Sequence, residues 1–378
     1  MTDAGTGVPT VEEFTAEARA WLAEQSSSAP ADYGAICPPD LIDQGIAWQR
    51  TMNVAGFTGI HWPVEYGGRG LSAEHQAAWM YECAVAGVPP VLNMVGLVLA
   101  AGAILHFGTP EQKAQHLQAT LKAEHVWCQL FSEPGAGSDL AGLSTKAERD
   151  GDEFVVNGEK VWCSGGRYSN WGILMARTDP SAPKHKGISF FLCPMDLPGL
   201  EIRPLRQITG EAEFDQVFFD DVRLPANSLV GPLNEGWGVG MAVLTNERGH
   251  IGTAVVGLER RLEAMTKLSG ERELNPLERQ RLANLIMKGM AYKAMALRQG
   301  PIASTAASLM KLGISEMMFE SALLRADIAG PSAMLEGPGS AGLIAAPGGR
   351  IAGGTSQVQR TIIGERLLGL PREPKNAS

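Results

Sequence analysis

The spacing of the apolar residues changes twice along this chain of 378 residues, and that change restricts the folds that it can adopt. From Val11 to about Glu124, apolar residues recur at helical spacing, as Phe14 and Ala18 do. From about Val126 to Val230 they form short runs separated by turn dipeptides, and from about Gly236 the helical spacing returns. This order predicts a mainly α-helical protein with a central β domain.

The middle region is expected to be a small antiparallel β domain. Asp150-Gly151 and Asn157-Gly158 flank the run Phe154 to Val156, and both dipeptides suit tight hairpin turns because each tolerates positive φ. Further strands are expected at three places, Trp171 to Ala176, Gly187 to Cys193 and Asp215 to Phe219.

The third region is expected to form a helical bundle that contains one long loop. Its helices are predicted at Gly236 to Glu259, Pro276 to Arg298, Ile302 to Ile328 and Gln357 to Leu368. Between the last two lies Gly330 to Gly354, in which 11 of 25 residues are Gly or Pro, so a functional or mobile loop without secondary structure is expected there. The domain limits that follow are 1–125 (all α), 126–230 (β) and 231–378 (helical).

Charge and composition exclude several classes of protein. The formal net charge of −9 repels polyanions, so a nucleic-acid partner is not expected, although helix N-termini and glycine turns can still bind a phosphate-bearing cofactor. Five widely spread cysteines without zinc-ligand spacing predict a reducing, cytoplasmic location and no metal site. The most apolar window, Val95 to Leu105, is too short to span a membrane and is expected to be a buried core helix.

Two motifs of the middle region carry candidate ligand contacts. Residues 132–139, Ser-Glu-Pro-Gly-Ala-Gly-Ser-Asp, form a glycine-rich turn with hydroxyls at both ends, and its glycines let the backbone approach a ligand closely. Further along, Trp162 offers a stacking surface for a planar ring, and Ser164 offers a hydroxyl that could bond a ring edge. Taken alone, the turn could equally be a plain surface turn, and a Trp in a strand is more often a core residue.

Together and in this order, these features resemble the acyl-CoA dehydrogenase family. The resemblance extends over nearly the whole chain and rests on four ordered motifs, at residues 107–113, 132–139, 157–162 and 354–360. It implies an N-terminal helical domain, a small antiparallel β-barrel-like domain and a C-terminal four-helix bundle. It also implies FAD as the cofactor and a reaction that introduces an α,β double bond into a CoA thioester.

The resemblance also assigns candidate binding residues. The residues that match flavin-contacting positions are Gln129, Phe131 and Ser132 on one side of the ring, Trp162 and Ser164 on the other, and Thr355 and Gln357 near the FAD at a subunit boundary. Ser138 matches a residue that contacts the CoA moiety. Gln129 departs from the pattern, because a larger aromatic residue is common at that position.

The catalytic base is expected on a different element from the one that most family members use. The reaction needs a carboxylate in a dry pocket, where desolvation raises the pKa and strengthens the base. Most members place a Glu immediately before the C-terminal Gly-Thr, but this chain has Gly353 there. Glu247 falls into the apolar stripe of the helix expected from Gly236, three residues after Leu244, and matches a Glu that serves as base in some members. Arg248 matches a residue near the substrate, and a buried ion pair between Glu247 and an arginine is the alternative reading.

Two further elements of the family are missing. Lys267 to Gly270 replaces an Arg followed by Phe-Gly, and Asp327 to Pro331 replaces a Gln that leads into Gly-Gly-x-Gly; in the family both elements reach the FAD of the neighbouring subunit. The pattern resembles two-gene enzymes that act on CoA thioesters of steroid side chains. A sister subunit is therefore expected to supply both elements in a heterotetramer with two copies of each chain, with an electron-transfer flavoprotein as acceptor. The alternatives are a non-catalytic subunit of such a complex and a related acyl-CoA oxidase.

Overall fold

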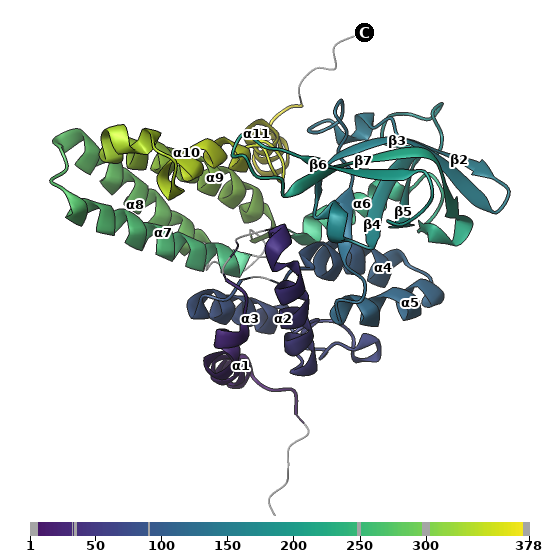
Figure 1. The fold of residues 1–378 in the computed structure, drawn as a ribbon, viewed down its shortest axis with the longest axis horizontal. Helices are drawn as coiled ribbons and strands as arrows, with labels where there is room; N and C mark the ends of the chain where they lie inside the picture. The colour runs from purple at the N-terminus through teal and green to yellow at the C-terminus, as the bar shows by residue number, and fades with distance from the viewer. Residues whose placement is uncertain are drawn as a thin grey trace, which may run out of the picture. The chain divides into compact units, whose positions relative to one another are not determined.

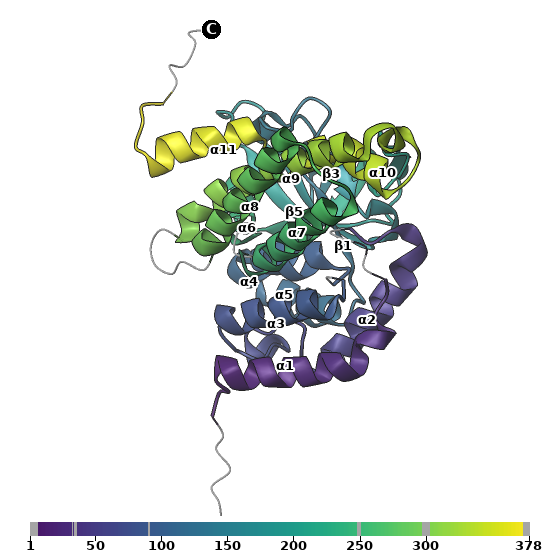
Figure 2. The same cartoon turned by 90° about the vertical axis from the view of Figure 1, so that its left-hand side faces the viewer.

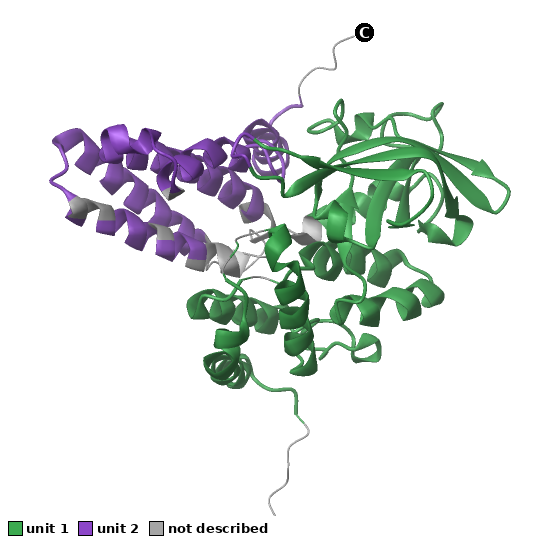
Figure 3. Ribbon diagram, viewed as in Figure 1, with its two compact units in different colours: residues 1–207, 211–247 green, residues 208–210, 248–378 purple. Residues whose placement is uncertain are grey.

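The chain divides into two compact units. The computed structural model describes residues 7–372 except 32, 34–35, 90, 248–250 and 297–302. The first unit comprises Met1–Gln207 and Glu211–Glu247, and the second comprises Ile208–Gly210 and Arg248–Ser378 (Figure 3).

Helices occupy the beginning and end of the described chain, and strands occupy its middle (Figure 1). The helices are α1 (Val11–Gln25), α2 (Ile42–Val54), α3 (Ala73–Ala86), α4 (Ala101–Phe107), α5 (Pro110–Leu121), α6 (Gly236–Glu247), α7 (Ile251–Glu271), α8 (Pro276–Ala296), α9 (Ala303–Ala329), α10 (Pro338–Gly349) and α11 (Ser356–Ile362). The strands are β1 (Trp127–Leu130), β2 (Lys146–Asp150), β3 (Glu153–Ser164), β4 (Trp171–Arg177), β5 (Ile188–Pro194), β6 (Leu200–Leu205), β7 (Phe214–Pro225) and β8 (Leu229–Val230).

The strands form one eight-stranded sheet in the first unit. Their order is β6-β7-β3-β2-β4-β5-β8, and β1 pairs with β4 beside this path. The three strands expected after the first hairpin correspond to β4, β5 and β7. Most neighbours are antiparallel, as predicted, but the pairs β1–β4 and β2–β4 are parallel, so the sheet is mixed. The alternation of apolar residues along a strand carries no information on the direction of its neighbour.

One of the two predicted hairpin turns is wrong. Asp150-Gly151 does join β2 to β3, and Gly151 has a φ of 60°. Asn157-Gly158 instead lies inside β3, where the register against β7 shifts and Gly158 has a φ of 145°. A Cβ at Gly158 would lie 2.8 Å from Thr145 Cα, so this glycine serves a β-bulge and a close strand contact, not a turn.

The helical part of the first unit agrees with the local sequence signals. Thr109 caps α5, because its hydroxyl accepts from Gln112 N and the Gln112 side chain accepts from Thr109 N. The apolar window from Val95 is a helix, in which a π-helical stretch continues as α4, and Leu99 and Ile104 are buried. None of the described helices is both long and apolar enough to cross a bilayer.

The C-terminal helical region, residues 231–378, differs from the expectation at one place. The helix predicted from Gly236 to Glu259 corresponds to α6 of the first unit and α7 of the second, which lie on either side of residues 248–250, outside the described part. The loop predicted at Gly330 to Gly354 contains α10, which packs on α9 as α11 does (Figure 2). Pro338 occupies the first turn of α10, where proline is tolerated, and packing against α9 outweighs the low helix propensity of the glycines.

A pair of histidines, His116 buried and His125 half-buried, joins α5 to the start of the sheet. His116 of α5 and His125, just before β1, place their Nδ1 atoms 3.2 Å apart, and the rings of Trp127 and Trp171 pack against both. Burial lowers the pKa of His116 to about 4, and the neighbouring His125 adds to this effect. Burial also lowers the pKa of His125, against the opposing effect of Glu124. Both rings are therefore neutral in the folded chain at neutral pH.

Acidification is expected to destabilise the fold through His116. Because its pKa is lowered in the folded state, the unfolded chain binds more protons, so the free energy of unfolding falls as the pH drops from about 6.5 towards about 4. Between pH 7.5 and pH 5 this residue should account for a loss of about 2 kcal/mol. In urea unfolding at both pH values, His116→Gln should remove that part of the pH dependence, whereas the same change at the exposed His61 should not. An unaltered pH dependence in His116→Gln would contradict this assignment.

Candidate active site

The glycine-rich turn that follows β1 folds back on itself. Glu133 and Ala136 exchange two backbone hydrogen bonds, of 3.1 and 3.0 Å. Gly135 and Gly137 do not have positive φ, and a Cβ at either would meet no atom within 4 Å. Neither the backbone conformation nor a contact within the described residues therefore requires glycine at these positions. The open space suits a ligand that approaches the backbone closely, and Ser138 is exposed beside it.

Trp162 lies in a β-bulge of β3 and has a strained backbone. Its φ of 62° falls in the left-handed region that bulky residues avoid, and the register of β3 against β7 shifts between Lys160 and Cys163. The bulge leaves the indole 55% exposed, with the Phe214 ring 5.6 Å away in an edge-to-face arrangement. Trp162 is therefore not a core residue, and its exposed face fits a planar ring.

The other candidate residues of the first unit lie close to this bulge. Ser164, the last residue of β3, is half-buried, and so is Gln129 of β1, the strand that contacts β3. Ser132 is tied to β3 by its carbonyl, which accepts from Val161 N at 2.9 Å. Phe131 is 3% exposed, so a ligand contact from this residue would come from its main chain. The structure thus brings together the flavin-side residues predicted in this unit on two adjoining segments.

Sequence reasoning missed the buried ion pair beneath these segments. Lys160 is fully buried, and its Nζ lies 2.8 Å from Glu133 Oε1 and 3.0 Å from Phe131 O. The sequence did indicate that Lys160 is buried. It lies an even number of residues after the buried Phe154 and Val156 of β3, and side chains two residues apart on a strand lie on the same face. A lysine on the apolar face of a strand requires a buried counter-charge.

Helix α6 docks closely on the sheet. A Cβ at Gly236 would lie 2.4 Å from a backbone nitrogen of β5, so only glycine permits this approach. Further along α6, Val243 is buried in the core cluster that also contains Phe131. The helix ends at Glu247, and the side chains of Glu247 and Arg248 lie outside the described residues.

Thr355 and Gln357 lie at the start of α11 in the second unit. The Thr355 hydroxyl caps the helix by accepting from Val358 N at 3.1 Å, so its proton can still be donated, and Gln357 is exposed. Gly353 and Gly354 have φ values of 63° and 91°, so the loop before the helix adopts a conformation that favours glycine.

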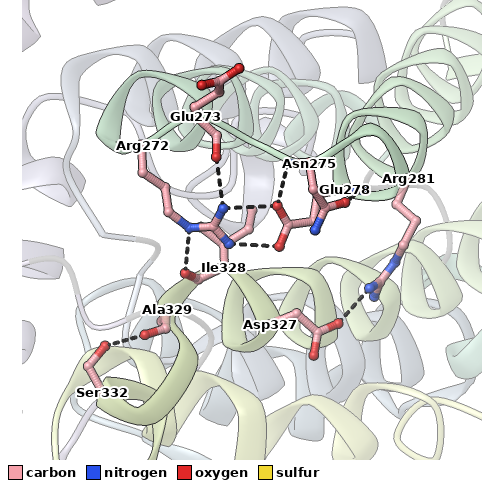
Figure 4. A network of polar contacts seen from close by, with 9 residues as sticks. All are labelled: Arg272, Glu273, Asn275, Glu278, Arg281, Asp327, Ile328, Ala329 and Ser332. Atoms are coloured by element: carbon pink, nitrogen blue, oxygen red, sulfur yellow. Dashed lines mark hydrogen bonds and ion pairs between the residues drawn. The ribbon is translucent and has the colours of Figure 1, made fainter.

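A polar network at one end of the bundle includes Asp327 and Ile328 of the second segment expected to lack flavin contacts, together with Arg272, which follows the first such segment closely in sequence (Figure 4). Arg272 donates to both carboxylate oxygens of Glu278, at 3.0 and 2.7 Å, and its Nε donates to Ile328 O at 3.1 Å. Arg281 pairs with Asp327 at 2.5 Å. These contacts hold the connection between α7 and α8 against the end of α9. The side chains of Arg272 and Arg281 are therefore occupied by contacts within the bundle.

The cysteines contribute packing. All five are free, four of them buried and Cys83 half-buried. Burial raises the pKa of Cys128 to about 12, so this thiol stays protonated. Within the described part of the chain, no group of three His, Cys, Asp or Glu residues is placed to hold a metal ion.

Comparison with known proteins decides the family. Sequence models described as the N-terminal, middle and C-terminal domains of acyl-CoA dehydrogenase match residues 9–124, 128–222 and 234–368. The chain belongs to the acyl-CoA dehydrogenase family. Members of this family are FAD flavoproteins. Three predictions are therefore confirmed: the family, the order of a helical, a β and a helical domain along the chain, and the class of enzyme.

Relatives match over nearly the whole chain. The acyl-CoA dehydrogenase IpdE1 of Mycobacterium tuberculosis is 38% identical over 382 residues, which cover 97% of this chain and 99% of IpdE1. The acyl-CoA dehydrogenase FadE34 of the same species is 39% identical over 333 residues, which cover 86% of this chain but 46% of FadE34. The solved structure of the Tcur3481-Tcur3483 steroid ACAD (acyl-CoA dehydrogenase) has a TM-score of 0.81 at 27% identity, covering 96% of this chain and 98% of that chain. The ChsE4-ChsE5 complex from M. tuberculosis has a TM-score of 0.77 at 28% identity, covering 98% and 100%.

Proposed function

We propose that this acyl-CoA dehydrogenase uses Glu247 to remove the α-proton of a CoA thioester. The supporting observation is that Glu247 lies on α6 four residues after Val243, which is buried in the same core cluster as Phe131. Residues four apart share a face of a helix, so position 247 continues the face of α6 that packs into the core. A carboxylate at the end of that face would be shielded from water, and desolvation would raise its pKa towards the working pH. Gly353 has no side chain that could act instead.

The residues of this chain fit a flavin in the first unit. The exposed face of Trp162 and the unobstructed backbone at Gly135 and Gly137 suit a flat ring with polar edges. We assign the contacts with FAD to Gln129, Phe131, Ser132, Trp162, Ser164, Thr355 and Gln357, and the contacts with substrate to Ser138 and Arg248. FAD, when bound, supplies the acceptor for the β-hydride, while the chain orients both molecules, excludes water and removes the α-proton.

A bulky acyl group, such as a steroid side chain, is the proposed substrate. The support is the similarity to a structure named a steroid ACAD, which extends over 96% of this chain. The test is to add a panel of acyl-CoA thioesters to the purified flavoprotein without oxygen and to record bleaching of the flavin absorbance. Bleaching by steroid-type thioesters and not by short-chain ones would support the proposal. A flavin that no thioester bleaches would instead favour a non-catalytic subunit, and peroxide formed under air would favour an oxidase.

A sister subunit of the same fold is the proposed partner. Helix α8 packs Leu282 and Leu285 into the core of the bundle, yet Leu277, Met287 and Met290 are 65%, 61% and 62% exposed. A helix with apolar residues on opposite sides is normally buried on both. Both solved relatives are named for two chains. FadE34 is long enough to contain a second chain of this size, because this chain covers 46% of it.

Charges on the exposed face of α8 are expected to prevent assembly. Met287→Lys with Met290→Lys should abolish co-purification with a co-expressed sister subunit, because burying two lysines without partners costs several kcal/mol, or about 10³-fold in affinity. Size-exclusion chromatography and the FAD content of the complex measure the effect. Met334→Lys, at a methionine that is 86% exposed on another segment, is the matched control. Unchanged assembly of the double variant, or full FAD loading of the lone wild-type chain, would count against a required partner at this face.

Three further expectations stay proposals. Electrons are proposed to leave through an electron-transfer flavoprotein, and the location is proposed to be cytoplasmic. The division into domains at 1–125, 126–230 and 231–378 is supported by the limits of the three family matches.

A further inference from the structure

The buried pair Lys160–Glu133 lies between the two segments that carry the candidate flavin contacts. Lys160 is fully buried on β3, two residues before the strained Trp162. Its Nζ donates to Phe131 O at 3.0 Å and to Glu133 Oε1 at 2.8 Å, so one ammonium group binds the residues on both sides of Ser132.

Glu133 is held on its other sides as well. Its Oε2 accepts from Ser144 N at 2.6 Å and from Ser144 Oγ at 2.8 Å, and its Oε1 accepts from Thr145 N at 2.9 Å. Burial alone would raise the pKa of Glu133, but Lys160 and these hydrogen bonds outweigh it and lower the pKa to about 2. The carboxylate is therefore ionised and fixed in orientation.

The main chain extends this connection to the bulge. Val161, the residue after Lys160, donates its N–H to Ser132 O at 2.9 Å, and the bulge follows directly with Trp162. A bulky residue at a φ of 62° persists only where the surrounding structure holds it firmly. A buried charged pair beside the bulge supplies such a constraint, because neither partner can leave without stranding a buried charge.

We propose that Lys160 and Glu133 are positioning residues of the flavin site: they fix Phe131, Ser132 and Trp162 relative to one another and so align the ring with the substrate. This inference rests on the proposed function, which places those three residues against the flavin. It assigns a role to two motif residues that take no part in the chemistry. Neither residue exchanges a proton with the substrate.

The experiment separates positioning from stability by removing both charges together. Lys160→Met alone strands the Glu133 carboxylate and should lower the melting temperature. The double variant Lys160→Met with Glu133→Gln leaves no buried charge and keeps one amide oxygen that can accept from Ser144, although Thr145 N then loses its acceptor, so its melting temperature should recover in large part. If the pair only stabilises the fold, the function of the double variant should recover too.

For the positioning role, the double variant should stay impaired although it is folded. The rate of flavin reduction by acyl-CoA should fall about 10²-fold, with KM within about twofold of wild type. The dissociation constant for FAD, from flavin fluorescence titration, should rise about tenfold, because the contacts are no longer preorganised. Lys146→Met with Glu148→Gln, an exposed pair on β2, is the matched control. All proteins are co-expressed with the sister subunit.

The possible failures can be told apart. A double variant that matches wild type in rate and in FAD affinity would overturn the positioning role alone. A wild-type complex that binds no FAD, or whose FAD no acyl-CoA reduces, would overturn the proposed function and this inference with it.

Discussion

Glu247→Gln is expected to lower the rate of flavin reduction by acyl-CoA about 10³-fold while FAD stays bound. The amide has nearly the same shape as the carboxylate but cannot accept the α-proton. FAD should remain bound because the proposed cofactor contacts lie on β1 and the turn that follows it, on β3 and at the start of α11, outside α6. Anaerobic stopped-flow measurement of flavin bleaching gives the rate, and the absorbance of the purified protein gives the FAD content.

The pH dependence sharpens this test. In wild type, the rate of bleaching should rise with pH as the base loses its proton, and this rise should disappear in Glu247→Gln. Glu235→Gln, at an exposed glutamate just before α6, is the matched control and should behave as wild type. A Glu247→Gln variant that reduces flavin at the wild-type rate would place the base elsewhere. A variant that instead unfolds more readily would point to a structural ion pair of Glu247.

The sequence predicted the order of the regions because periodicity reports which residues face a core. Thr109 as the cap of α5 and the strands β4, β5 and β7 follow directly from such local patterns. Asn157-Gly158 was misread because a glycine with positive φ serves a bulge as well as a turn. Helix α10 was missed because its stability comes from packing on α9, and the glycines and prolines of this segment give no sign of that contact.

The candidate site was only partly readable from sequence. Ser132, Trp162 and Ser164 could be placed together, because the motifs around them resemble a known family. The exposure and backbone strain of Trp162 could not be predicted, because they arise from a shift in register between β3 and β7. The spacing of Lys160 along β3 indicated that it is buried. Its partner Glu133 could not be predicted, because Glu133 lies in a turn after a different strand and reaches Lys160 only through the fold of that turn.

Trp162→Gly is expected to weaken FAD binding about 30- to 100-fold and to leave the fold nearly as stable as before. Covering the exposed half of an indole contributes about 2–3 kcal/mol to binding, at about 25 cal/mol per Å². A tryptophan in the left-handed region costs about 1–2 kcal/mol, which glycine does not pay. The relief of this strain should offset both the lost contact with Phe214 and the greater chain entropy of glycine.

Weaker FAD binding together with an unchanged free energy of unfolding would identify Trp162 as a binding residue whose strained backbone lowers the stability of the fold. Trp162→Phe serves as the control, because it keeps a ring and the unfavourable φ and should therefore retain most of the affinity without a gain in stability. Flavin fluorescence titration gives the affinity, and urea unfolding of the apoprotein gives the stability. A large loss of stability in Trp162→Gly would mean that the indole packs the fold despite its exposure. Undiminished FAD affinity would mean that the flavin ring lies elsewhere, and that the strain at position 162 has another cause.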